Sequence, residues 1–134
     1  MKHVLLSALL LTLLCTCGRA PEKAPATDPA VAEPAAVYQD LSPAEFAERI
    51  GAENTVLLDV RTPAETAGGI IPGALELDFR APDFAQKLSE LDPDKTYLVY
   101  CASGGRSGKT CARLNEMGLS KVYNLRGGYS AWSN

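Results

Sequence analysis

The chain has 134 residues, of which 46% are hydrophobic, and it carries a formal net charge of −3. Residues 38–134 suffice for one compact domain and no more. A mildly acidic chain without a basic cluster gives no case for nucleic-acid binding. The only histidine is His3, in the first residues, so the domain has no imidazole base and most transition-metal sites are excluded. We therefore expect no metal and no other cofactor.

Residues 1–17 are predicted to be a secretory signal peptide. Lys2 and His3 form a short basic start, and an apolar run follows from Val4 to Leu14. The eleven residues of this run would form a helix of about 16 Å, short of the roughly 30 Å of hydrocarbon in a bilayer. The pattern therefore favours a removed or lipid-modified leader over a permanent transmembrane helix.

The end of this leader resembles the signal of bacterial lipoproteins. Leu14 stands three residues before Cys17, and Gly18 follows. The resemblance implies a lipid on Cys17 that anchors an exported protein on the periplasmic or cell-surface side of a membrane. Thr16 departs from the small residue usual before the cysteine, and Cys15 is the weaker candidate for the lipid. An ordinary signal peptide, cut beyond Cys17, is the other interpretation.

Residues 18–37 are predicted to be a linker. Alanine dominates this stretch, and a proline recurs every four or five residues. Such a composition cannot form a core and favours extended, polyproline-like chain. The linker would hold the domain about 50 to 60 Å from a membrane, unless its length serves no purpose.

The domain opens with a helix and a buried strand. Ser42 is a typical N-cap, Pro43 suits the first turn, and Glu45 completes a capping box. This pattern predicts a helix to about Ile50. The continuous apolar run from Thr55 to Val60 is typical of a strand that is buried on both faces.

Strands and helices then alternate. The predicted elements are a helical turn at 63–67, a weak strand at 75–77, a helix at 82–91, a buried strand at 96–100, a helix at 107–117, a strand at 121–124 and a last helical turn that ends at Trp132. This alternation predicts an α/β fold with a small, mostly parallel sheet and helices on both faces.

A cysteine follows the buried strand at 96–100. In a parallel sheet, ligands bind beyond the carboxyl ends of the strands, which is where Cys101 falls. The next residues are small, and Gly104 and Gly105 allow a tight loop whose N–H groups turn inward to bind an anion. We predict that this cradle extends from Ala102 through Ser103 to Arg106 and Ser107.

The cradle favours the thiolate form of Cys101. The helix predicted to begin near Ser107 adds free N–H groups and its positive dipole end. Arg106 adds a permanent charge whose planar fork suits oxyanions. Since the thiolate is the nucleophile, Cys101 is the predicted catalytic residue, and it needs no external base.

These segments resemble single-domain rhodaneses. The loop matches the Cys-x-x-Gly-x-Arg form of small sulfurtransferases, and the family's other motifs follow in order: Asp59-Val60-Arg61 with Glu65, Ile71-Pro72-Gly73-Ala74, and Asn124 to Trp132. The resemblance implies a rhodanese-like fold and transfer of a sulfane sulfur from thiosulfate or a persulfide donor to a thiol or cyanide, through a persulfide on Cys101.

In this interpretation residues 102–107 bind the donor, and Arg106 steers its negative charge. Asp59, Arg61 and Glu65 are expected to be structural, pairing with loop backbone or with each other. The expected partners are a small anionic sulfur donor and a thiol acceptor, for which a thioredoxin-like protein is one candidate. We expect a monomer.

Cys111 has two interpretations. A free cysteine inside a helix commonly behaves as a small buried hydrophobe. Alternatively, it is a resolving thiol for Cys101, which oxidising conditions outside the cytosol would permit. The distance disfavours a bridge, because Cys111 lies over two helical turns into its helix, about 6 Å or more from the loop.

Two other functions compete with sulfur transfer. Phosphatases and arsenate reductases also place a cysteine and an arginine around an anion, but those phosphatases use Cys-x5-Arg, and this chain has Cys-x4-Arg. The other alternative is a catalytically silent rhodanese-like module that binds a partner or senses redox state.

Overall fold

The computed structural model describes residues 38–133. The predicted leader, Cys17 and the predicted linker lie outside the described residues. Within residues 38–133, no helix has the length and apolar character needed to cross a bilayer.

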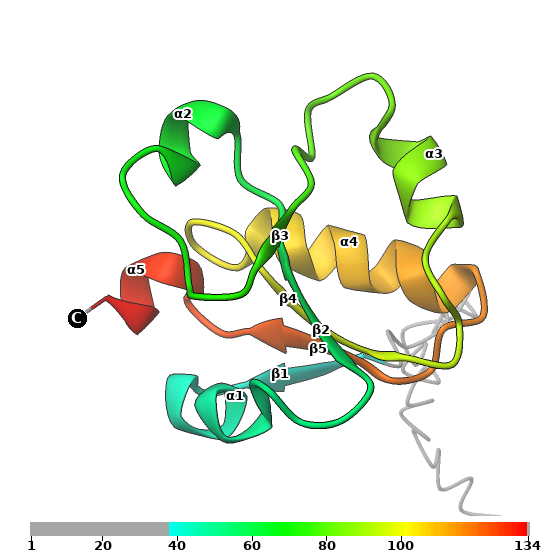
Figure 1. The fold of residues 1–134 in the computed structure, drawn as a ribbon, viewed down its shortest axis with the longest axis horizontal. Coiled ribbons are helices and arrows are strands. Elements are labelled where there is room, and N and C mark those ends of the chain that lie inside the picture. Colours follow the sequence, from blue (N-terminus) through cyan, green and yellow to red (C-terminus); the bar gives the residue numbers. More distant parts are fainter. Residues whose placement is uncertain (1–37, 134) are drawn as a thin grey trace, which may run out of the picture. The chain divides into compact units, whose positions relative to one another are not determined.

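The described residues form a five-stranded sheet in which every strand pair is parallel (Figure 1). Its spatial order is β1-β5-β4-β2-β3, so β4 lies at the centre. The strands are β1 (Gln39–Leu41), β2 (Thr55–Asp59), β3 (Leu75–Glu76), β4 (Thr96–Tyr100) and β5 (Val122–Leu125).

Helices cover both faces of this sheet. They are α1 (Pro43–Arg49), α2 (Pro63–Thr66), α3 (Phe84–Ser89), α4 (Gly105–Glu116) and α5 (Gly128–Trp132). One buried cluster joins Phe84 and Leu88 of α3 to Leu114 of α4. The other joins Phe46 of α1 to Leu41 and Leu125, with α5 against it. The predicted α/β fold is therefore confirmed.

The side chains of β4 alternate between these two clusters. Tyr97 and Val99 pack with α3 and α4, while Leu98 and Tyr100 pack with α1 and α5. Each of the four is at most 1% exposed, which explains the unbroken apolar run. The same alternation points Cys101, the residue after β4, toward the face that carries α4.

Local signals fixed where the first two helices begin. At α1, the Ser42 N–H donates to Glu45 Oε2 over 2.9 Å, and the Glu45 N–H donates to Ser42 Oγ over 3.4 Å. At α2, the Thr62 N–H donates to Glu65 Oε2 over 3.0 Å. Each helix thus begins with a capping box and a proline in its first turn.

Two predicted helices begin at other residues in the structure, and one strand was not predicted. β1 was not predicted, because Gln39 and Asp40 of this three-residue edge strand are exposed and give no apolar run. The helix predicted at 82–91 is shorter, Phe84–Ser89. The helix predicted to begin near Ser107 begins at Gly105, because Gly104 takes a left-handed conformation as its N-cap.

Candidate active site

The Cys101 side chain lies at the carboxyl end of the central strand, under a loop that turns into α4. The residue is 1% exposed. Its sulfur accepts a hydrogen bond from the Gly104 N–H over 3.1 Å and one from the Ser107 hydroxyl over 3.4 Å. The structure thus brings Cys101 together with two of the residues expected in the cradle.

The turn of the loop depends on Gly104. This residue has φ +96°, and a Cβ atom there would lie 3.3 Å from the carbonyl oxygen of Leu125. A side chain would therefore be both strained and crowded. Because α4 begins immediately afterwards, Arg106 and Ser107 belong to its first turn, where backbone N–H groups lack partners within the helix.

Hydrogen bonding outweighs burial in setting the acidity of Cys101. Burial alone would raise the pKa of its thiol. The Ser107 hydroxyl and the backbone N–H groups of Ser107, Ser103 and Gly104 stabilise the thiolate, and they hold the pKa below the ordinary value of 9.0. The cradle therefore activates the cysteine without a separate base.

Arg106 turns its guanidinium toward a carboxylate. Its Nη1 donates to Glu65 Oε2 over 2.8 Å, and its Nη2 donates to Glu65 Oε1 over 2.5 Å. The same carboxylate accepts from the Thr62 hydroxyl over 2.8 Å. Arg106, first through its hydrogen bonds, holds the pKa of Glu65 far below its usual range. The charge expected to steer the donor is therefore paired.

Asp59 and Arg61 form a second ion pair, which is buried. Arg61 Nη2 donates to Asp59 Oδ2 over 2.7 Å and to the Gly69 carbonyl over 2.7 Å. The guanidinium also lies over the ring of Tyr129, 4.0 Å from its centroid. The pair thus connects the loop after β2 to α5. None of these contacts involves the Cys101 sulfur.

The start of α5 supports the loop from behind, and the sequence did not indicate this. The Tyr129 N–H donates to the Cys101 carbonyl over 2.7 Å, and the Ser130 N–H donates to the Ala102 carbonyl over 3.0 Å. Gly128 permits this approach, since a Cβ atom there would lie 2.5 Å from the Cys101 carbonyl oxygen. The only available signal was the Gly-Gly pair of the closing motif.

Asn124 is a further support that the sequence did not single out. Its amide donates to Asp40 Oδ1 over 2.7 Å and to the Gly104 carbonyl over 3.4 Å. The residue is 6% exposed. Asn124 thus connects the edge strand β1 to Gly104. Gly104 is the N-cap of α4, and its N–H donates to the Cys101 sulfur.

Cys111 is fully buried in the core among residues of α3, β4 and β5. Burial raises the pKa of its thiol well above the ordinary range. Both cysteines of residues 38–133 are free thiols. In this structure Cys111 packs as a hydrophobic residue.

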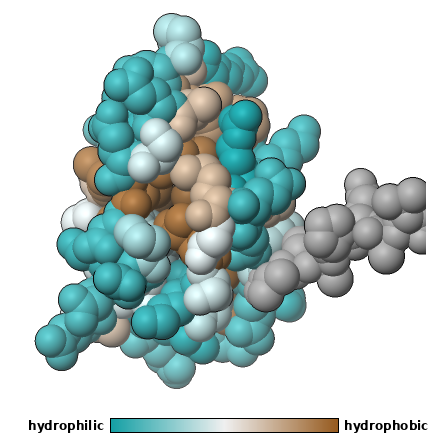
Figure 2. All heavy atoms as spheres, turned by 90° about the vertical axis from the view of Figure 1, so that its right-hand side faces the viewer, coloured by the Kyte–Doolittle hydropathy of each residue, from teal (hydrophilic) through white to brown (hydrophobic). Residues whose placement is uncertain are grey.

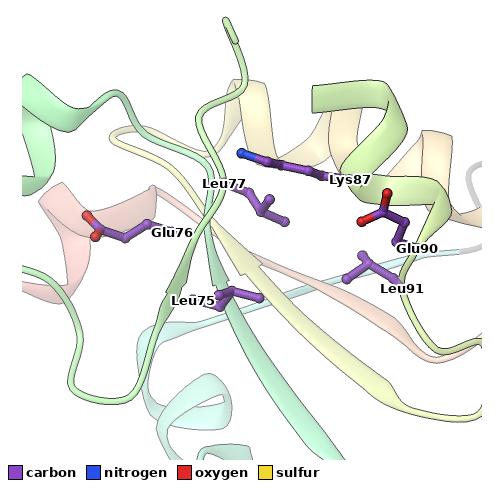
Figure 3. Close-up of a pocket in the computed structure, with 6 residues that line it drawn as sticks. All are labelled: Leu75, Glu76, Leu77, Lys87, Glu90 and Leu91. Atoms are coloured by element: carbon purple, nitrogen blue, oxygen red, sulfur yellow. The ribbon is translucent and has the colours of Figure 1, made fainter. Parts of the chain in front are cut away.

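A separate hollow of about 420 Å³ lies between β3 and α3. Figure 3 shows its lining: Leu75, Glu76, Leu77, Lys87, Glu90 and Leu91. Figure 2 shows apolar surface at the centre of the face that carries α3 and the end of α4, ringed by hydrophilic side chains. No cysteine lines this hollow, so it offers no second thiol beside Cys101. Residues 38–133 also contain no cluster of three or more His, Cys, Asp or Glu that could hold a metal ion.

Known proteins are similar to this chain in sequence and in structure. The chain is 44% identical over 81 residues to a sulfurtransferase of Allochromatium vinosum, covering 60% of this chain and 74% of that protein. It is 41% identical over 95 residues to a putative sulfurtransferase of Bacillus subtilis, covering 70% and 89%. A rhodanese-related protein from Thermoplasma volcanium has a similar structure, with a TM-score of 0.63, 30% identity, and coverage of 72% and 91%.

The family model of the rhodanese-like domain matches residues 42–134. The matched part contains the Cys101 loop, both ion pairs and α5. The chain therefore belongs to the rhodanese-like domain family.

Proposed function

We propose that this protein is a rhodanese-type sulfurtransferase that carries sulfane sulfur as a persulfide on Cys101. The observation that supports this most directly is the cradle. The sulfur of Cys101 accepts hydrogen bonds from the Gly104 N–H and the Ser107 hydroxyl, and its thiol pKa is lowered despite burial. Such a site stabilises an anion on sulfur before and after transfer.

The reaction has two halves. The Cys101 thiolate attacks the outer sulfur of the donor, the donor's bond to that sulfur breaks, and the leaving group departs as sulfite from thiosulfate or as a thiolate from a persulfide. Cys101 is then a persulfide, and the outer sulfur of this persulfide carries the negative charge. An acceptor thiolate or cyanide then attacks this sulfur and releases the Cys101 thiolate. The enzyme therefore ends the cycle in the form in which it began.

The names of relatives support the general reaction and show a range of activities. A thiosulfate sulfurtransferase of Pseudomonas entomophila is 36% identical over 95 residues, 71% of this chain and 84% of that protein. A tRNA uridine(34) hydroxylase of Cytophaga hutchinsonii is 40% identical over 93 residues, but the chain covers only 29% of it. The donor thus has to be established on this chain itself.

Mass spectrometry of the intact protein tests the proposal. After incubation with thiosulfate, polysulfide or glutathione persulfide, Cys101 should gain the mass of one sulfur atom, and cyanide or a dithiol should remove it. Cys101→Ser should abolish the gain. Cys111→Ala is the matched control and should retain it, because Cys111 is buried away from the loop.

If none of the three donors adds sulfur to Cys101, the protein is not a sulfurtransferase. A catalytically silent module that binds a partner or senses redox state would then be the better explanation. Addition of sulfur to Cys111 in place of Cys101 would likewise overturn the assignment.

We also propose that the domain acts outside the cytosol, as a monomer attached to a membrane through a lipid on Cys17. The support is the leader and linker pattern of residues 1–37. A mass spectrum of membrane-extracted protein should show an N-terminal peptide that begins at an acylated Cys17. A soluble form cut beyond Cys17 would contradict the anchor and leave the sulfur chemistry untouched.

A further inference from the structure

The ion pair between Arg106, in the cradle, and Glu65, on α2, bears on the choice of sulfur donor. Arg106 and Glu65 make two hydrogen bonds, of 2.8 and 2.5 Å. Their side chains are 20% and 33% exposed. The pair is thus a part of the cradle that solvent reaches, which we call the mouth of the cradle, and its net charge is zero.

Glu65 is held in this place by its own helix. Its Oε2 atom accepts from the Thr62 N–H over 3.0 Å and from the Thr62 hydroxyl over 2.8 Å. Arg61 Nη1 donates to the Glu65 carbonyl over 3.4 Å. The carboxylate is thus fixed before the donor arrives, and Arg106 does not have to order it. Because the pKa of Glu65 is held far below its usual range, chiefly by hydrogen bonds from Arg106, the negative charge persists at any physiological pH.

Arg106 also lies close to the reactive sulfur in the chain fold, since it directly precedes Ser107, whose hydroxyl donates to the Cys101 sulfur over 3.4 Å. The pKa of Arg106 is raised, first by the hydrogen bonds to Glu65 and to a lesser extent by the negative charge of Cys101. The Arg106 guanidinium is therefore paired with Glu65 and also feels the charge of the Cys101 thiolate. With Glu65 present, three charges at the mouth sum to −1, and without it they would sum to zero.

We propose that Glu65 is a specificity-determining residue that disfavours dianionic sulfur donors such as thiosulfate and selects donors with a single negative charge, the class to which a persulfide anion on an uncharged carrier belongs. The inference rests on the proposed sulfur transfer and narrows its donor. A dianion pays twice the repulsion of a monoanion at the same distance, and Arg106 cannot offset it while bound to Glu65.

Two small donors isolate this effect. Thiosulfate and methanethiosulfonate differ only in that a methyl group replaces one anionic oxygen. Each gives the same persulfide on Cys101 and leaves as sulfite or as methanesulfinate, so atoms and charge balance in both. With cyanide as acceptor, thiocyanate formation gives kcat/KM for each donor.

In Glu65→Gln, the ratio of kcat/KM for thiosulfate to that for methanethiosulfonate should rise about fivefold, the size expected of one solvent-screened charge. Glu65→Asp keeps the charge and should leave the ratio within about twofold of the wild type. Glu48→Gln, an exposed carboxylate on α1, changes the net charge equally and should leave the ratio unchanged. Arg106→Gln leaves Glu65 uncompensated and should lower the ratio.

An unchanged or lower ratio in Glu65→Gln would overturn the proposal, because Glu65 would then only position Arg106 for thiosulfate. Should Glu65→Gln fail to fold, the Asp and Arg106 variants decide: a ratio that rises in Arg106→Gln, or changes strongly in Glu65→Asp, would also overturn it. If the wild type accepts sulfur from neither of these donors nor from polysulfide or glutathione persulfide, the proposed function fails. If it transfers from both and the ratio does not respond, only the role of Glu65 fails.

Discussion

Cys101 and Cys111 are two buried thiols of one domain that differ in acidity. Both are at most 1% exposed. The Cys101 sulfur has hydrogen-bond donors around it and a lowered pKa, while burial raises the pKa of Cys111. Burial alone therefore does not make a thiol inert, because what surrounds the sulfur decides which form is stable.

This difference predicts a selective reaction with iodoacetamide. Cys101 should be alkylated with a midpoint below pH 9, since its thiolate forms below the ordinary pKa of 9.0. Ser107→Ala removes a donor to the thiolate and should raise the midpoint by about one pH unit. Peptide mass spectrometry across pH gives both values. Ser120→Ala, at an exposed serine, should behave as the wild type, and alkylation of Cys111 ahead of Cys101 would contradict the prediction.

A buried ion pair near the loop and an exposed ion pair at α3 should contribute differently to stability. Asp59 and Arg61 are 0% and 4% exposed, whereas Asp83 and Lys87, on the surface of α3, are about half exposed. Removing one partner of a buried pair leaves an uncompensated charge, while an exposed pair is screened by water.

Asp59→Asn should therefore lower the free energy of unfolding by about 3 to 5 kcal/mol. Asp83→Asn is the matched surface change and should alter it far less, because water screens the exposed pair. Urea unfolding monitored by circular dichroism measures both. Equal, small losses would mean that Asp59 contributes little to stability.

At the scale of elements, the site is made by three segments that meet at the carboxyl edge of the sheet. The loop before α4 supplies the sulfur and its donors, α2 supplies Glu65, and α5 holds the loop backbone. Figure 1 shows α2, α5 and the loop between β4 and α4 on the same side of the domain. The contact between α5 and the loop is backbone to backbone, which requires a residue without a side chain.

Gly128→Ala tests this contact. Gly128 has φ +61°, and a Cβ atom there would overlap the Cys101 carbonyl oxygen at 2.5 Å. The change should push α5 off the loop, lower the free energy of unfolding by more than about 2 kcal/mol, and slow alkylation of Cys101. Gly51→Ala is the control, since Gly51 also has a positive φ, +80°, but has nothing within 4 Å of the added atom. It should cost only about 1 kcal/mol.

At the scale of the whole domain, the central strand lies between two cores. Leu98 is fully buried in the cluster with α1, and Leu75 on the edge strand is 51% exposed. The buried strands carry the loop of the site at their carboxyl ends and also form the core. Their packing therefore contributes to the stability of the entire domain.

Leu98→Ala should lower the free energy of unfolding by about 2 to 5 kcal/mol, because it leaves a cavity between sheet and helix. Leu75→Ala should change it by less than about 1 kcal/mol, since about half of the Leu75 side chain is already exposed to solvent. Thermal and urea unfolding of the two variants measure the difference. A loss at Leu75 as large as that at Leu98 would contradict the division into core and edge.

Much of this protein could be predicted from local sequence. The apolar run of β4 predicted its bounds, Thr96–Tyr100, and the capping box at Ser42 predicted where α1 begins. The composition of residues 101–107 predicted an anion cradle, because small residues and glycine permit inward N–H groups whatever surrounds them. These patterns depend on residues that are neighbours in the chain, so they can be interpreted without knowledge of the fold.

The tertiary structure alone decided which distant residues meet at the loop. Glu65 and Arg106 are 41 positions apart, and Asn124 pairs with Asp40 across 84. Their contacts follow from the order β1-β5-β4-β2-β3, which gathers the carboxyl ends of parallel strands at one edge. The sequence thus determined that Cys101 lies in a loop whose N–H groups lower the pKa of its thiol. Whether Arg106 faces a donor or a carboxylate depended on packing between segments, which no local pattern encodes.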